Sequence, residues 1–213
     1  MDIEAEIKQL DNLIMEMSGV VEKNLNYAID VYLNYDLAKV YNPVDDEKVN
    51  SYERWIESDA LHLMIKERLY ADDLRRVTGI MSMVQDLERL GDHAKDILQF
   101  ALRLRKANRS EKRIKELIDF VMKMVHDSIY SYIKRDLTLA RDVIIRDDHV
   151  DSEYDALLSQ LIDEDKEEEI TASYTVYTAL VVKYLERIAD HATNVAEWVV
   201  YITSGFYKDK QII

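Results

Sequence analysis

The sequence contains no cysteine, only one proline and only four glycines in 213 residues. Without cysteine, the chain can form neither a disulfide nor a thiolate metal site, and it fits a reducing cytoplasm. Sheet proteins need frequent glycine and proline in their turns. Their scarcity, together with 48% hydrophobic and 33% charged residues, predicts an all-α fold built from amphipathic helices.

Long hydrophobic runs and excess positive charge are also missing. The longest uncharged run, residues 170–182, is shorter than the roughly 20 residues that span a bilayer. The first residues are acidic and mixed, so we expect no signal peptide. A formal net charge of −14 argues against binding to nucleic acid or to anionic lipid. We therefore expect a cytoplasmic protein that does not insert into the membrane.

One string of residues occurs twice. LERLGDHA begins at Leu87 and LERIADHA begins at Leu185, 98 residues later (185 − 87 = 98). An internal repeat defines the architecture. It predicts two tandem pseudo-repeated three-helix bundles, residues 1–107 and residues 108–213. In each half we expect a long helix, a shorter helix and a long helix that carries the string.

Apolar periodicity and turn residues give the expected boundaries of the six helices. The first spans residues 4–37 and is stopped by Tyr41-Asn42-Pro43. The second begins at Asp45 or Asp46, and the third follows a break at residues 70–73. After a boundary at residues 106–110, the fourth runs to Leu137. Asp147-Asp148 opens the fifth, the acidic residues 163–169 form a solvated turn, and Gly205 caps the sixth.

Each copy of the repeated string places two carboxylates on one helix face, one turn apart. The candidate metal ligands are Glu88, Asp92, Glu186 and Asp190, with Asp96 and Glu197 as secondary candidates. Unneutralised acids at this spacing repel each other, so an oxygen-seeking metal ion or a basic partner would stabilise them. The alternative is a solvated face neutralised by Arg89 and Arg187 or by basic residues on other helices.

Other side chains give weaker indications. Further carboxylate ligands are guesses: Asp127, Glu53 and Asp155. His93 and His191 lie about 140° around the helix from the first acid of their string, so we interpret them as hydrogen-bonded structural residues. The string also lacks the Glu-x-x-His spacing of ferritin-like di-iron proteins.

Basic residues crowd the segment 103–115. They either complement the C-terminus of the third helix or contact an acidic partner or the acidic face of the other half. The four glycines are scattered, so no phosphate-binding loop indicates an enzyme.

The two strings, the Asp73-Leu74-Arg75 segment and the Ile202-Thr203-Ser204-Gly205 ending together resemble the signatures of the PhoU family across nearly the whole chain. The resemblance implies a cytoplasmic, non-enzymatic regulator, peripheral at the membrane through its partners and often a homodimer. It would connect the ATPase of a phosphate ABC transporter with a sensor histidine kinase, and would negatively regulate phosphate transport and phosphate-starvation genes. It also implies multinuclear metal, iron or zinc, on Glu88, Asp92, Glu186 and Asp190. On chemistry alone, carboxylates also suit manganese, magnesium or calcium.

Two departures from the family pattern bear on these expectations. The Gln-Pro that commonly precedes the Asp-Leu-Arg element is absent, and Gln99 stands where the second half has Glu197. We therefore expect the first half to hold metal less well. The alternatives are a metal-centred helical protein, an accessory protein of a non-ABC phosphate transporter, and a helical interaction protein unconnected with phosphate.

Overall fold

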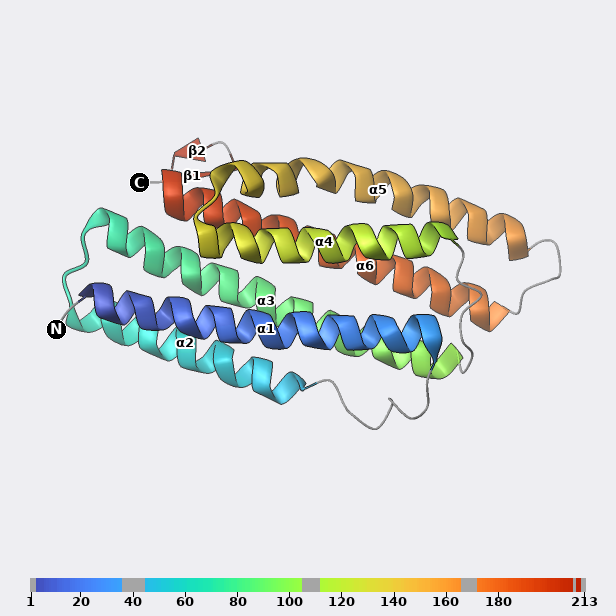
Figure 1. The fold of residues 1–213 in the computed structure, drawn as a ribbon, viewed down its shortest axis with the longest axis horizontal. Coiled ribbons are helices and arrows are strands. Elements are labelled where there is room, and N and C mark those ends of the chain that lie inside the picture. Colours follow the sequence, from blue (N-terminus) through green and yellow to red (C-terminus); the bar gives the residue numbers. More distant parts are fainter. Residues whose placement is uncertain (1–2, 36–44, 105–111, 166–171, 209, 212–213) are drawn as a thin grey trace.

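The computed structural model describes residues 3–35, 45–104, 112–165, 172–208 and 210–211, and it forms two three-helix halves that pack side by side (Figure 1). The first half holds α1 (Ile3–Asn34), α2 (Asp46–Lys66) and α3 (Ala71–Leu104). The second holds α4 (Lys112–Lys134), α5 (Leu137–Asp165) and α6 (Ala172–Ser204). Two-residue strands β1 (Phe206–Tyr207) and β2 (Lys210–Gln211) follow as an antiparallel pair. The prediction of an all-α fold with two pseudo-repeated halves is confirmed.

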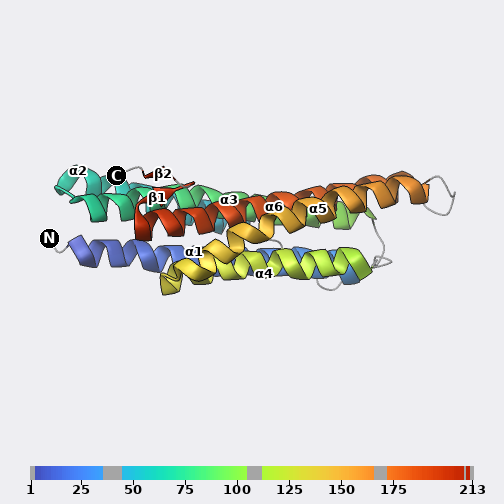
Figure 2. The same ribbon diagram turned by 90° about the horizontal axis from the view of Figure 1, so that it is seen from above.

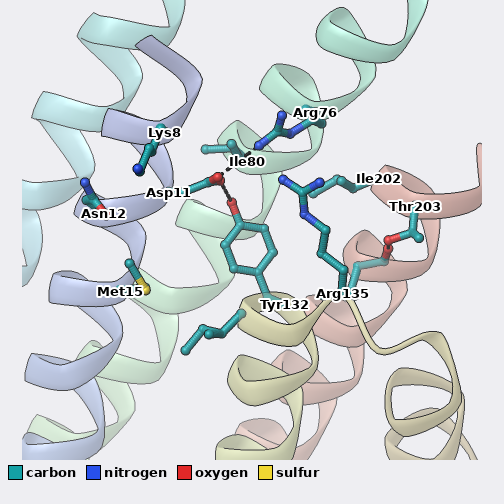
Figure 3. Close-up of a pocket in the computed structure, with 12 residues that line it drawn as sticks. Lys8, Asp11, Asn12, Met15, Arg76, Ile80, Tyr132, Arg135, Ile202 and Thr203 are labelled. Carbon is teal, nitrogen blue, oxygen red and sulfur yellow. Dashed lines mark hydrogen bonds and ion pairs between the residues drawn. The ribbon is translucent and has the colours of Figure 1, made fainter. Parts of the chain in front are cut away.

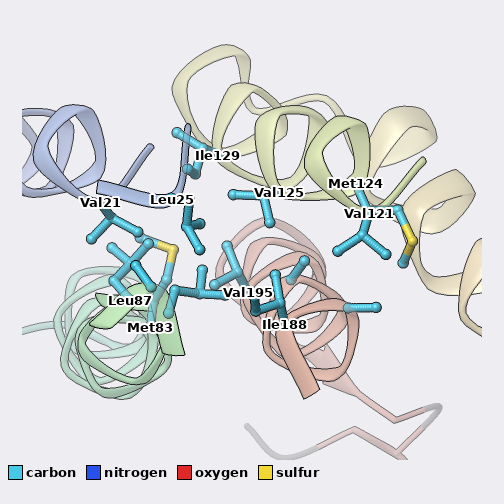
Figure 4. Close-up of a cluster of buried hydrophobic side chains, with 14 of the residues drawn as sticks. Val21, Leu25, Met83, Leu87, Val121, Met124, Val125, Ile129, Ile188 and Val195 are labelled. Carbon is cyan, nitrogen blue, oxygen red and sulfur yellow. The ribbon is translucent and has the colours of Figure 1, made fainter. Parts of the chain in front are cut away.

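The halves meet through their equivalent helices. α3 packs against α6, and α1 packs against α4. Figure 2 shows α2, α3 and α6 in one layer and α1 and α4 in a second layer beneath it, with α5 rising from the level of α4 to that of α6. The apolar positions predicted for the repeated strings form the core, since Leu87, Leu90, Ile188 and Ala192 are each buried. One continuous cluster of buried hydrophobic side chains runs through both halves (Figure 4).

Two left-handed residues end the first helix of each half. Tyr35 has φ 42° and donates its N–H to the Val31 carbonyl, and Arg135 has φ 52°. α1 therefore ends at Asn34, before the predicted end at residue 37, and the predicted stop at residues 41–43 lies outside the described residues. The predicted end of the fourth helix at Leu137 is wrong because α4 ends at Lys134.

The largest correction concerns α5. We expected Asp147 to open it, but the helix begins ten residues earlier (147 − 137 = 10), at Leu137. The Asp136 carboxylate accepts the N–H groups of Thr138 and Leu139, both at 3.0 Å, which is the action of an N-cap. As a result α5 has 29 residues and α4 has 23. The expected long-short-long order is thus wrong for the second half.

The break predicted at residues 70–73 is wrong for 71–73, because α3 begins at Ala71. Two helix caps agree with the sequence. Asp45 caps α2 by accepting the Lys48 N–H at 3.2 Å, and Gly205 follows α6 with φ 80°. The predicted turn at residues 163–169 is wrong for 163–165, which are helical. The rest of that turn and the boundary at 106–110 lie outside the described residues. None of the described helices is long and apolar enough to cross a membrane.

Candidate metal centres

Four carboxylates from two helices converge in the second half, and we name them the second-half cluster: Asp147 and Asp151 of α5, with Glu186 and Asp190 of α6. One ligand oxygen from each of Asp151, Glu186 and Asp190 lies within 4.8 Å of the others. Spacings of four residues place each pair on one helix face, and the packing of α5 against α6 brings the two faces together.

The second-half cluster is electrostatically strained. Burial, followed by the charges of Asp190 and Asp151, raises the pKa of Asp147 to about 6. Burial and then the charges of Glu186 and Asp151 also raise the pKa of Asp190. Lys183 offsets part of the negative charge, because its Nζ lies 2.8 and 2.7 Å from the two Glu186 oxygens. A further cation among these oxygens would relieve the remaining repulsion.

The donor set fits a hard or borderline metal ion. All the converging ligand atoms are carboxylate oxygens, which suit magnesium, manganese, calcium or iron. Structural zinc sites favour histidine nitrogen and cysteine sulfur, and neither is in this group. Asp151 would hold such an ion from α5, and Glu186 and Asp190 would hold it from α6, with the Asp147 carboxylate beside them.

The equivalent place in the first half is partly neutralised by basic residues of the protein itself. Its members are Asp46 and Glu53 of α2 with Glu88 and Asp92 of α3, named here the first-half cluster. Burial and then the charge of Asp92 raise the pKa of Glu88, and Glu53 and Asp46 add to the effect. The Lys95 Nζ lies 2.9 Å from Asp46. Arg89 lies 3.5 Å from Glu88 and 3.4 Å from Asp92, as the solvated-face interpretation predicted.

Two sequence differences account for this asymmetry. An offset of 98 residues pairs Lys95 with Thr193, so a cation stands where the second half has a hydroxyl. An offset of 101 pairs Asp46 with Asp147 and Asn50 with Asp151, so an amide stands where the second half has a carboxylate, and the fourth acid of the first half, Glu53, comes from another position. The Asn50 Oδ1 is buried and accepts no hydrogen bond from a described residue. An amide and a lysine both lower the affinity of a carboxylate site for a metal ion.

The secondary candidates, Asp96 and Glu197, are close to other residues. Asp96 is 4.0 Å from the His93 Nδ1, and Glu197 pairs with Lys208 at 3.2 Å. Among the guessed ligands, Glu53 faces Glu88. Asp127 is instead used in ion pairs with Arg146 at 2.6 Å and Lys123 at 3.1 Å, and Asp155 is exposed on α5.

Sequence reasoning missed Asp147 and Asp151 as partners of the repeated string. It assigned Asp147 to the N-terminus of the fifth helix. A capping residue there has a non-helical backbone, so Asp147 was not counted on the same helix face as Asp151. The available signal was their spacing of four residues, the same as between Glu186 and Asp190. Capping by Asp136, eleven residues upstream (147 − 136 = 11), would have moved the helix start and revealed the shared face.

The two histidines lie where α3 meets α6, and their ring centroids are 5.3 Å apart. His191 is hydrogen-bonded as predicted, with its Nδ1 2.9 Å from Asp86, a carboxylate that also accepts from Asn194 at 3.1 Å and Trp198 at 3.0 Å. The prediction is wrong for His93, which is buried and forms no hydrogen bond with a described residue. Burial, followed by the charges of His191, Arg187 and Arg89, lowers its pKa to about 4.

Two arginines of the basic segment 103–115 interact with other residues of the chain. Arg113 forms a two-pronged ion pair with Glu153 of α5 at 2.8 and 3.2 Å. Arg103 lies 3.5 Å from the Tyr177 hydroxyl and over its ring. Lys112 lies 3.4 Å from Glu116 and Lys115 is exposed. Residues 105–111, which carry the other basic residues of the segment, lie outside the described part of the chain.

Comparison with known proteins identifies one family whose model matches both halves of the chain. The family model described as the PhoU domain matches residues 14–101 and again residues 114–199. A "Phosphate-specific transport system accessory protein PhoU homolog" of Pseudomonas aeruginosa is 31% identical over 206 residues, covering 94% of this chain and 85% of that protein. The Escherichia coli K12 "Phosphate-specific transport system accessory protein PhoU" is 28% identical, with the same coverage of both chains.

A solved structure gives the same result. The crystal structure of PhoU from Pseudomonas aeruginosa superimposes with a TM-score of 0.90 and 29% identity, covering 96% of this chain and all of that one. Because the family model matches twice and spans most of the sequence, and the fold agrees over nearly its whole length, the chain belongs to the PhoU family.

Proposed function

We propose that this chain is a non-enzymatic accessory protein of a phosphate transport system. The observation that carries the proposal is the match of both halves to the PhoU domain, together with relatives about 30% identical over 94% of the chain that bear this accessory role in their names. Deletion of the gene tests it. We expect altered phosphate uptake, restored by the wild-type gene, and unchanged uptake in the deletion strain would contradict the proposal.

A more specific role follows from the family resemblance. In this role the protein contacts the ATPase subunit of a phosphate ABC transporter and a sensor histidine kinase at the cytoplasmic face, acts as a homodimer, and lowers phosphate uptake and phosphate-starvation gene expression when phosphate is plentiful. An accessory role beside a non-ABC transporter is the alternative. Cross-linking in cells separates the two, because the adaptor role requires adducts with the ATPase and the kinase.

We further propose that the second-half cluster binds an oxygen-seeking metal ion, with iron, manganese, magnesium and zinc as the ions to test. Support comes from the convergence of Asp151, Glu186 and Asp190 and from the raised pKa of Asp147 and Asp190, which repulsion and burial cause together. A bound cation would neutralise this repulsion and cross-link α5 to α6. The first-half cluster, which Lys95 and Arg89 partly neutralise, should bind metal more weakly.

Calorimetric titration with manganese or iron(II) tests the metal role separately from transport. Asp151→Asn and Asp190→Asn should each weaken binding at least tenfold, because each removes one converging carboxylate charge. Asp155→Asn is the matched control, since Asp155 is an exposed acid on α5 outside the cluster. Wild-type affinity in the first two variants, or equal loss in all three, would refute this assignment.

A further inference from the structure

A cavity of about 220 Å³ lies where α1, α3, α4 and α6 come together, away from both carboxylate clusters. Its polar lining consists of Lys8, Asp11, Asn12, Arg76, Tyr132 and Thr203, with Arg135 just beyond α4. Apolar side chains of α1, α3, α4 and α6 complete the wall, and Figure 3 shows the cavity. Arg76 is 12 residues before Glu88, roughly 18 Å along α3, so the cavity is a separate site.

Three cationic side chains converge on this cavity in a chain whose net charge is −14. Figure 3 shows the guanidinium of Arg135 turned toward Arg76 and the hydroxyl end of Tyr132. The Arg135 N–H donates to the Tyr132 carbonyl at 3.2 Å, but neither the Lys8 nor the Arg135 side chain forms a hydrogen bond or ion pair with a residue in the described ranges. Like charges brought together without a partner repel each other, so an anion between them would stabilise this arrangement.

The one carboxylate inside the cavity is already engaged on both oxygens. Arg76 donates to one Asp11 oxygen at 2.9 Å, and the Tyr132 hydroxyl donates to the other at 2.5 Å. Burial and the charge of Asp11 keep the pKa of Tyr132 well above its usual value, so the phenol remains a donor. Asp11 therefore orients Arg76 and Tyr132, and Glu4 pairs with the other terminal nitrogen of Arg76 at 3.4 Å. Lys8 and Arg135 are exposed, and their side chains have no ion-pair partner among the described residues.

The geometry points to a phosphate group as the ligand, and we propose that this cavity binds inorganic phosphate or a small phosphate monoester. Guanidinium groups bind phosphate oxygens with paired N–H donors, and an ammonium adds a point charge. Asn12 and Thr203 supply neutral polar groups at the wall. A cavity of about 220 Å³ holds one such group with a few waters, and the chain's negative charge excludes a long polyanion. This site goes beyond the proposed accessory role and does not depend on the metal.

Titration calorimetry with the full-length protein at constant ionic strength tests the proposal, with inorganic phosphate in one arm and glycerol 3-phosphate in the other. Saturable binding in either arm is expected, and the arm that binds more tightly identifies the source of the phosphate group. The double variant Lys8→Gln, Arg135→Gln should weaken binding at least tenfold. Glutamine keeps a β-carbon at the left-handed position of Arg135, so the backbone strain there is unchanged.

The matched control is Arg68→Gln, Lys115→Gln, which removes the same two charges from exposed positions on other parts of the surface. It should bind phosphate within twofold of wild type, because neither residue lines the cavity. Circular dichroism confirms that both double variants fold. Absence of saturable binding in both arms, or equal weakening in the two double variants, would overturn the proposal. The transport and metal experiments use other residues, so their failure is distinguishable from failure here.

Discussion

Replacing Asp147 by asparagine should stabilise the metal-free protein at neutral pH. Burial and the neighbouring Asp190 and Asp151 raise the pKa of Asp147 from 3.8 to about 6, a shift of about 2 units. At 1.36 kcal/mol per unit, full ionisation costs up to about 3 kcal/mol of folding stability. Asp147 is only half-buried, so solvent screening reduces this to roughly 1.5 kcal/mol. Asparagine has the same shape and carries no charge.

The effect of Asp147→Asn on folding stability should depend on pH. A carboxyl group whose pKa is higher in the folded state binds protons more tightly there, so folding stability falls as pH rises from about 4 to about 6. Below about pH 4 both states are protonated and the charge costs nothing. Asp147→Asn should therefore raise the melting temperature by about 3–6 °C at pH 7.5 and have little effect at pH 4.

Thermal unfolding in the presence of a chelator, followed by circular dichroism at both pH values, measures this difference. Asp148→Asn is the control, because Asp148 is the exposed neighbour on the same helix and its substitution should stay within about 0.5 kcal/mol. An unchanged or lower melting temperature of Asp147→Asn at pH 7.5, or an equal gain at both pH values, would refute the reasoning about the second-half cluster.

Three further predictions concern other parts of the molecule. Asn50→Asp with Lys95→Thr copies the second half into the first and should add a second manganese site, and unchanged stoichiometry by calorimetry would contradict this. Gly79→Ala should lower the free energy of unfolding by about 1–2 kcal/mol, because the added methyl would lie 2.3 Å from an α6 side chain. Gly19→Ala, with nothing within 4 Å, should raise it by about 0.5–1 kcal/mol, and urea titration compares the two. The His93 ring should titrate near pH 4 by NMR. Because the unfolded chain binds this proton more tightly, the free energy of unfolding should fall as pH falls from about 6.5 toward 4. A measured pKa near 6.5 would refute the burial of His93.

The repeated string predicted much of this architecture because its apolar positions recur at helical spacing in both halves. The seam formed by Leu87, Leu90, Ile188 and Ala192 is buried as the periodicity indicated. Helix type and repeat number depend on such local patterns, which one sequence contains. The closing residue Gly205 was also predictable, because a glycine after a long apolar helix is a common C-cap.

The start of α5 was not predicted, because two competing acids could each have capped it. Asp136 and Asp147 are both plausible N-caps in sequence, and only the left-handed Arg135 before the first of them determines the choice. That error hid half of the second-half cluster. Contacts between distant elements, such as Lys95 with Asp46 or Tyr132 with Asp11, depend on how helices pack and carry no local signal.

The most direct test of the accessory role is affinity capture of the full-length protein from its own cells after mild cross-linking, grown in high and in low phosphate. The account predicts recovery of the ATPase subunit of the phosphate transporter, identified by mass spectrometry, in amounts that change with phosphate supply. Recovery of no phosphate-transport component under either condition, from a protein that is folded and expressed at its normal level, would contradict the account.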